Sequence, residues 1–416
     1  MKRHITLYIL LAMLLGVGVG AVCHARIDDP ATLASFTGHL SLLTDVFLRL
    51  IKMIIAPLVF ATLVAGIAKM GDSGRLGRVG LRTLGWFVFA SLLSLLLGIL
   101  MVTLLAPGAT LALPVPPSDA QSGVAAGTLT LKDFITHLVP RSIAEAMAGN
   151  EILQIVVFSG FFGAALASLG ARGARVLEVI DELAHVMLRV TGYVMKVAPL
   201  AVFAAVAATV STHGLAILAT YGRFIGGFYL ALGVLWLVLG LLGFAVIRGR
   251  IVELARLVRE PVLLAFSTAS SEAAYPKTLE QLERFGASER IASFVLPLGY
   301  SFNLVGSMMY CTFATLFIAQ AYRIELSFQQ ELSMLLLLMV TSKGMAGVPR
   351  ASLVVIAATL THFHIPEAGL LLILAVDQFL DMGRSATNVL GNSIAAAVVA
   401  SWEGELAPAS AAPDEA

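Results

Sequence analysis

Charged residues and cysteines are scarce in this sequence. Only 13% of its 416 residues are charged and the formal net charge is +1, which leaves no basic surface of the kind that binds nucleic acid. The two cysteines, Cys23 and Cys311, are too few and too far apart in the chain to suggest a disulfide framework or a metal site. We therefore expect no nucleic-acid partner and assign no metal ligands from the sequence.

Hydrophobic residues make up most of the remainder. They account for 58% of the chain, and the mean hydropathy is +0.91. Several apolar runs reach the ~20 residues that a membrane-spanning helix needs, so the sequence predicts an all-α polytopic membrane protein. Apolar length and breaks at Gly, Pro or charged residues place the first six spans at residues 5–23, 41–67, 83–106, 150–170, 183–211 and 219–247.

Basic residues fall on alternate loops between these spans. The loops after the second, fourth and sixth spans are rich in Lys and Arg, whereas residues 107–131 contain neither. By the positive-inside rule the basic loops are cytoplasmic, which places the N-terminus in the cytoplasm as well.

Two later segments break the pattern of simple spans. Residues 261–276 pass from an apolar run to a Ser-rich tip, and residues 333–360 contain a second tip at 342–349, rich in Gly and closed by a Pro. Basic residues flank the first segment on both sides, so it enters and leaves the membrane on the same side. Re-entrant hairpins are tolerated where protein or water covers their backbone. Counting both segments as re-entrant returns the C-terminus to the cytoplasm.

A helix with polar residues follows each hairpin, which suggests an inverted repeat around a midplane site. In the first helix, Asn303, Gly306 and Ser307 interrupt an apolar span, and carbonyls freed there could coordinate ions or substrate. The alternative is an Asn303 that only joins neighbouring helices.

The second helix places five polar residues inside the apolar stretch 370–399. Their offsets of 0, 3, 4, 7 and 11 put them on one helix face: Asp381, Arg384, Ser385, Asn388 and Asn392. A charge at the bilayer centre costs about 2.5–3.5 kcal/mol, which makes this face a candidate functional site. The alternative is an Asp381–Arg384 pair that merely neutralises itself within the bundle.

Four segments in this part of the chain form a characteristic set. They are Ser-Thr-Ala-Ser-Ser-Glu-Ala-Ala-Tyr-Pro at 267–276, Asn-Leu-x-Gly-Ser at 303–307, Ser-Lys-Gly-Met-Ala-Gly-Val-Pro at 342–349 and Asp-Met-Gly-Arg-Ser-x-x-Asn at 381–388. In this order they resemble the dicarboxylate/amino acid:cation symporters, the glutamate transporter family. The resemblance implies a secondary transporter with eight transmembrane helices, two re-entrant hairpins and an elevator mechanism. It also implies a homotrimer surrounded by lipid in the bacterial inner membrane.

The resemblance implies a division of the chain into a fixed scaffold and a moving transport domain. We expect scaffold helices at 1–80 and 150–218, with an external loop at 107–149. The expected transport domain comprises helix 3 at 81–106, helix 6 at 219–251, hairpin 1 at 252–290, helix 7 at 291–322, hairpin 2 at 330–362 and helix 8 at 364–402, followed by a cytoplasmic tail at 403–416.

The resemblance also implies a small acidic substrate and the residues that bind it. Arg384 would clamp a carboxylate, since a planar guanidinium suits a planar carboxylate, and Asp381 would accept an α-ammonium group. The other expected contacts are Asn388, Ser385, Ser271, Ser307 and the backbone at Val348. Because family members that prefer C4-dicarboxylates tend to lack an acid at the position of Asp381, its presence favours glutamate or aspartate. A C4-dicarboxylate such as succinate, fumarate or malate, carried with protons or sodium, is the alternative.

Ion coupling is where the sequence departs from the sodium-coupled pattern. Val305 and Asn392 stand where such members carry Asp, and Met345 stands at a Thr position. Sodium prefers hard oxygen ligands, so its sites look depleted. Glu272 adds a carboxylate that burial would push towards protonation, which favours coupling to protons without any bound cofactor. The residues expected to take part in ion or proton coupling are Glu272, Asn303, Asn392, Ser342, Lys343 and Ser91.

The sequence leaves three alternatives to this interpretation. A salt bridge from Glu272 to Lys343 or Arg384 would remove its proton role. An intramembrane hydrolase with a Ser-Lys dyad, Ser270 or Ser271 with Lys343, is disfavoured because the sequence has no Gly-x-Ser-x-Gly elbow. An anion conductance alongside transport stays open. We therefore predict a transporter and not an enzyme.

Overall fold

Most of the described chain is helical. The computed structural model describes residues 5–70, 73–109, 116–117, 139–214, 221–341, 351–374 and 376–407. Within these ranges the β-structure is limited to one isolated bridge, between Ala287 and Leu406.

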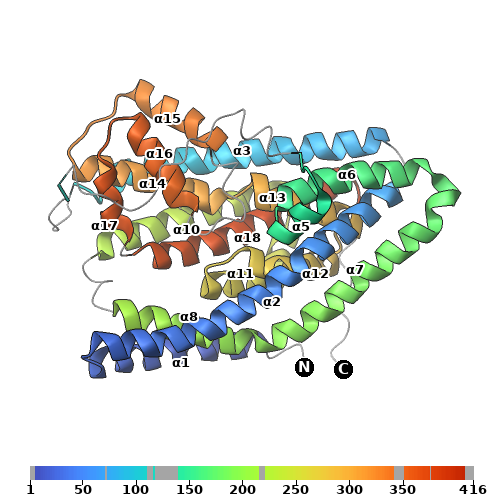
Figure 1. The fold of residues 1–416 in the computed structure, drawn as a ribbon. Helices are drawn as coiled ribbons and strands as arrows, with labels where there is room; N and C mark the ends of the chain where they lie inside the picture. Colours follow the sequence, from blue (N-terminus) through green and yellow to red (C-terminus); the bar gives the residue numbers. More distant parts are fainter. Residues whose placement is uncertain are drawn as a thin grey trace.

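The helices follow one another along the chain as Figure 1 shows. They are α1 (Ile5–Arg26), α2 (Pro30–Met70), α3 (Ser73–Leu105), α5 (Ile143–Gly149), α6 (Ile152–Ser168), α7 (Ala174–Val194), α8 (Ala198–His213), α10 (Gly222–Ile247), α11 (Arg250–Thr268), α12 (Tyr275–Phe285), α13 (Glu289–Phe302), α14 (Val305–Ala321), α15 (Phe328–Thr341), α16 (Ala351–His362), α17 (Leu370–Leu374) and α18 (Asp377–Trp402).

Six stretches of the described chain are long and apolar enough to cross a membrane. They are Leu7–Arg26, Pro30–Ala68, Gly77–Leu105, Gly170–His213, Gly222–Ile247 and Glu289–Ala321. Several helices are longer than the predicted spans. The spans are bounded by polar residues that end an apolar run, but such residues need not end a helix. The predicted external loop also contains a helix, α5, at its end.

The predicted first hairpin is a pair of helices, α11 and α12, joined by a short polar tip. Ala269 ends α11 in the left-handed conformation, with φ of 50°, and a short 3-10 turn covers Glu272–Ala274. Pro276 lies in the first turn of α12, where its missing N–H costs no helical hydrogen bond. A buried ion pair joins the two helices, with 3.3 Å between Lys277 Nζ and Glu260 Oε1.

The predicted interruption of the next helix is confirmed. Helix α13 ends at Phe302 and α14 begins at Val305, so Asn303 and Leu304 form a non-helical break. Beyond the break α14 lies very close to α18. A Cβ atom on Gly306 would come within 2.4 Å of the Arg384 carbonyl oxygen, so only glycine permits this approach.

Helix α18 runs through the middle of the molecule, packed against α10, α11, α13 and α14 (Figure 1). Between Gly383 and Ala400 only Leu390 is not fully buried. The polar residues of this helix must therefore find partners inside the protein. A separate set of contacts joins α1 to α8 and joins α2 to α6, α7 and α8.

The end of the described chain docks onto the rest of the protein. Glu403 forms ion pairs with Arg78 and Arg82 at 3.1 and 2.8 Å, and Glu405 pairs with Arg290 at 3.1 Å. The amide of Ala407 donates to the Gly286 carbonyl at 2.8 Å. Residues 403–407, predicted as the start of a tail, thus fasten the ends of α3, α12 and α13 together. We call them the C-terminal strap.

Candidate functional site

The polar face predicted for the last helix borders a cavity of about 450 Å³. Asp381, Arg384, Ser385 and Asn388 line it from α18, because helical periodicity turns these positions the same way. The other expected residues that line it are Ser271 and Glu272 from the tip between α11 and α12, and Ser307 from α14. The structure therefore brings seven of the predicted site residues around one space.

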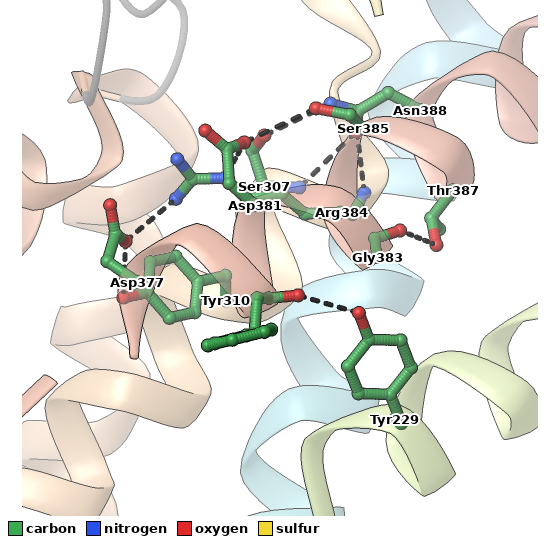
Figure 2. Close-up of polar contacts among 12 residues, drawn as sticks. Tyr229, Ser307, Tyr310, Asp377, Asp381, Gly383, Arg384, Ser385, Thr387 and Asn388 are labelled. Atoms are coloured by element: carbon green, nitrogen blue, oxygen red, sulfur yellow. Dashed lines mark hydrogen bonds and ion pairs between the residues drawn. The ribbon is translucent and has the colours of Figure 1, made fainter. Parts of the chain in front are cut away.

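Arg384 lies between two carboxylates, as Figure 2 shows. Its Nε donates to Asp381 Oδ1 at 2.6 Å, and its Nη1 lies 3.7 Å from Asp377 Oδ1. The guanidinium also lies over the Tyr310 ring, 4.8 Å from the ring centroid. Arg384 is only 3% exposed, yet its Nη1 has no hydrogen-bond partner within the described residues. Arg384 also lines the cavity, where a guanidinium suits the carboxylate of an acidic ligand.

Asp377 is a site residue that the sequence analysis missed. It is 2% exposed, and it accepts a hydrogen bond from the Tyr310 hydroxyl at 2.9 Å. The signal was available, since Asp377 precedes Asp381 by one helical turn and so shares its face. The predicted Asp381–Arg384 pair is therefore part of a larger network that holds the guanidinium in place.

Asn388 fixes the start of α14 against α18. Its Oδ1 accepts hydrogen bonds from the amides of Gly306 and Ser307 at 2.8 and 3.3 Å, and its Nδ2 donates to Ser307 Oγ at 3.1 Å. These amides belong to the first turn of α14 and have no intrahelical acceptor. The Ser307 hydroxyl can still donate its own proton to a ligand.

Two aromatic residues of α10 hold α18 at other points. The Tyr229 hydroxyl donates to the Phe379 carbonyl at 2.6 Å, and Trp236 Nε1 donates to Thr387 Oγ1 at 2.8 Å. Figure 2 shows Tyr229 and Thr387 beside the network around Arg384. The sequence analysis missed both contacts, since a Tyr or Trp in an apolar helix carries no signal of its partner.

Three predicted coupling residues lie away from the cavity. Asn303 Nδ2 donates to Asn392 Oδ1 at 2.9 Å, and both residues are fully buried. The remaining atoms of this pair, Asn303 Oδ1 and Asn392 Nδ2, have no hydrogen-bond partner in the described part of the chain. Ser91 is fully buried on α3.

Val305, two residues after Asn303, packs against α18. Its side chain is fully buried, and a Cβ atom on Gly391 would lie 2.6 Å from Val305 Cγ2. Its carbonyl accepts a hydrogen bond from Ser94, a residue of α3 that the sequence analysis did not select. The side chains described at this place are therefore the neutral amides of Asn303 and Asn392, the hydroxyl of Ser94 and the apolar Val305. The expected positions Ser342, Lys343 and Val348 lie outside the described residues.

Comparison with known proteins gives a consistent result. A family model described as the sodium:dicarboxylate symporter family matches residues 5–402. A C4-dicarboxylate transport protein of Anaeromyxobacter sp. (strain K) is 41% identical over 98% of this chain and 91% of its own length. One from Laribacter hongkongensis is 40% identical over 88% of this chain and 84% of its own. A proton/sodium-glutamate symport protein of Bacillus caldotenax is 39% identical over 95% of this chain and 94% of its own length.

Proposed function

Because the chain belongs to the sodium:dicarboxylate symporter family, and is a transporter and not an enzyme, we propose that it imports L-glutamate or L-aspartate with protons. The observation that carries the proposal is Arg384, a buried residue that lines the cavity and whose Nη1 has no hydrogen-bond partner within the described residues. A substrate carboxylate would complete its coordination. Glutamate and aspartate are small enough for a cavity of about 450 Å³.

The preference for an amino acid rests on Asp381. Arg384 and Ser385 both donate to its Oδ1, at 2.6 and 3.3 Å, and these bonds leave Oδ2 without a described donor. With 21% of its side chain exposed, Asp381 could accept an α-ammonium group from the cavity. A C4-dicarboxylate is the second candidate, favoured by the names of the two C4-dicarboxylate relatives.

Charge balance supports coupling to cations. The described cavity lining contains Asp45, Glu272 and Asp381 but only Lys52 and Arg384 as basic residues. Adding an anionic substrate to this lining without a cation would be costly at low dielectric. Against a negative interior each charge is worth about 2.3 kcal/mol per 100 mV, so a monoanion needs at least two protons before the potential assists import.

Protons are favoured over sodium by the chemistry of the available groups. Val305 and the Asn303–Asn392 pair offer no carboxylate beside the break in the helix, whereas Glu272 offers one at the cavity. Arg384 is already paired with Asp381 and Asp377, so it is not the group that neutralises Glu272 in this arrangement.

The proposed elevator movement uses the division into scaffold and transport domain that is expected from the sequence. In this proposal α1, α2, α6, α7 and α8 form the scaffold of a homotrimer in the bacterial inner membrane. The remaining helices carry the site across it as an elevator, and the second hairpin closes the cavity on the outside.

The test is uptake of radiolabelled L-glutamate, L-aspartate and succinate into proteoliposomes, with an inward proton gradient or an inward sodium gradient imposed separately. We expect accumulation of an amino acid on the proton gradient alone, and its loss in Glu272→Gln. Accumulation on sodium alone would contradict proton coupling. Accumulation of succinate with exclusion of both amino acids would contradict the role of Asp381.

A further inference from the structure

A second polar face, on α2, borders the same cavity. Its lining residues are Ser41, Thr44, Asp45, Leu48 and Lys52. Their offsets of 0, 3, 4, 7 and 11 equal those of the polar residues on α18, so they also share one face of their helix. The sequence analysis did not single out this stripe, because α2 reads as an ordinary span with a few charges. We call it the α2 stripe.

Lys52 is the unusual member of the α2 stripe. It lies near the middle of the candidate span Pro30–Ala68, where an ammonium group in contact with hydrocarbon would be costly. Its side chain is half-buried and borders the cavity. None of the ion pairs among the described residues involves Lys52. Lysines in such positions face water or an anion, and the cavity provides the place for both.

The surroundings leave this ammonium group available to a ligand. The neighbouring helix α8 contributes two alanines and a threonine to the lining, Ala205, Ala208 and Thr209. None of these three side chains carries a charge that could pair with the Lys52 ammonium group. Arg384, the other basic residue of the described lining, is by contrast held between Asp377 and Asp381.

We propose that Lys52 is a second cationic contact for the acidic substrate and pairs with the carboxylate that Arg384 does not hold. The inference rests on the proposed function, since it needs a substrate with two carboxylates. Arg384 binds one end from α18, and Lys52 meets the other end from α2 while the cavity is open. The two groups belong to different helices. Lys52 therefore contributes to the initial binding of the substrate, and it loses contact with the substrate if α18 moves away from α2.

The test compares substrate affinity and transport in matched variants. Lys52→Met removes the charge and keeps most of the side-chain volume, Lys52→Arg keeps the charge, and Arg49→Met removes a charge from an exposed position three residues away on α2. We expect Lys52→Met to raise the KM for the transported acid about tenfold with little change in maximal rate, in line with electrostatic capture. The variants Lys52→Arg and Arg49→Met should stay near the wild-type value. The dependence of KM on salt should weaken in Lys52→Met alone.

A second variant keeps the proposal falsifiable if Lys52→Met proves unstable. Asp45→Asn removes a negative charge from the α2 stripe and should lower KM about threefold. An unchanged KM in Lys52→Met, or in Asp45→Asn where Lys52→Met is unstable, would overturn the inference and leave the proposed function intact. Wild-type protein that takes up neither acidic amino acids nor succinate would overturn both.

Discussion

Arg384 is held by neighbouring side chains and also lines the cavity. Two carboxylates and the face of Tyr310 compensate its charge, yet Nη1 has no hydrogen-bond partner in the part of the chain that the structure describes. In the proposed function, a substrate carboxylate binds to this guanidinium from the cavity that Arg384 lines. The guanidinium geometry matters here as much as the charge, since a planar fork binds two oxygens at once.

Replacing Arg384 with Lys separates geometry from charge. The ammonium group keeps the charge but loses the planar fork and at least one charged hydrogen bond, worth about 1.5–3 kcal/mol. We expect substrate affinity, measured by calorimetry, to fall about 10- to 100-fold. The matched control is Arg223→Lys, at an exposed position of α10. Unchanged affinity in Arg384→Lys would show that Arg384 contributes only charge.

The sequence predicted the polar face of α18 but not all the residues that bond to it. Periodicity alone placed Asp381, Arg384, Ser385 and Asn388 on one side of a helix, and these residues do line one cavity. Partners from other helices, such as Tyr310 and Trp236, depend on how helices pack, and no local pattern encodes that. The spacing of polar residues along one helix can be read from the sequence, whereas their contacts with other helices cannot.

At the scale of elements, the contact between α14 and α18 depends on Gly306. Gly306→Ala would place a methyl group 2.4 Å from the Arg384 carbonyl oxygen and 2.8 Å from Thr387 Cβ. The helices would have to separate, at a cost of about 1–3 kcal/mol for overpacking, and the hydrogen bond from the Gly306 amide to Asn388 would lengthen. We expect a lower Tm and weaker substrate binding.

The control for this substitution is Gly233→Ala on α10, where an added methyl group meets nothing within 4 Å. That variant should be as stable as wild type or slightly more so, because alanine favours a helix more than glycine does. Equal stability of both variants would argue against a tight contact at Gly306.

The base of the first hairpin carries an acid with an unusual pKa. Burial, with the nearby charges of Glu289 and Glu280, raises the pKa of Glu283 from its ordinary 4.5 to about 7. Glu283 lies beside a cavity of about 280 Å³ that it shares with His185 of α7 and Glu289 of α13. The carboxyl is outside the six candidate spans.

The sign of the pH effect follows from the direction of this shift. The folded protein holds the proton of Glu283 more tightly than the unfolded chain, so the carboxyl contributes stability below about pH 4.5 that is lost as the pH rises through 7. We expect hydrogen exchange in α12 to accelerate, and Tm to fall, between pH 5 and pH 8. Glu283→Gln should flatten this dependence, whereas Glu178→Gln, at an exposed position of α7, should preserve it. A steep pH profile in Glu283→Gln would assign the effect to another group, with Asp181, Glu182, His185 and Glu289 as the neighbours to test.

For the whole molecule, the C-terminal strap joins elements that lie far apart in the sequence. Glu403 has only 1% of its side chain exposed and pairs with two arginines of α3. Glu403→Gln would leave both arginines without their carboxylate, and we expect a loss of about 1–2 kcal/mol of stability, since the arginines themselves are partly exposed. Thermal unfolding measures the loss.

Limited proteolysis provides an independent measure of the strap. The connections at the ends of α3, α12 and α13 should be cleaved faster in Glu403→Gln than in wild type. Glu325→Gln, at an exposed position between α14 and α15, is the control and should cleave normally. Identical cleavage and Tm in all three proteins would show that the strap does not fasten these ends.

The sequence predicted the helical character of the whole molecule and the break at Asn303, because apolar length and glycine positions are local signals. It did not predict the docking of residues 403–407. Their composition is that of a solvated tail, and the arginines that bind them lie more than a hundred residues away in the chain. The α2 stripe escaped notice for the same reason, since its meaning depends on the cavity it faces.

The strap also imposes an order on biosynthesis. Residues 403–407 leave the ribosome after every helix they fasten, and chains begin to fold from the N-terminal side while they are still being made. Until the strap emerges, nothing from it joins the base of the first hairpin to α3. The contacts that tie the base of the first hairpin to α3 through the strap are therefore among the last that the described chain can form.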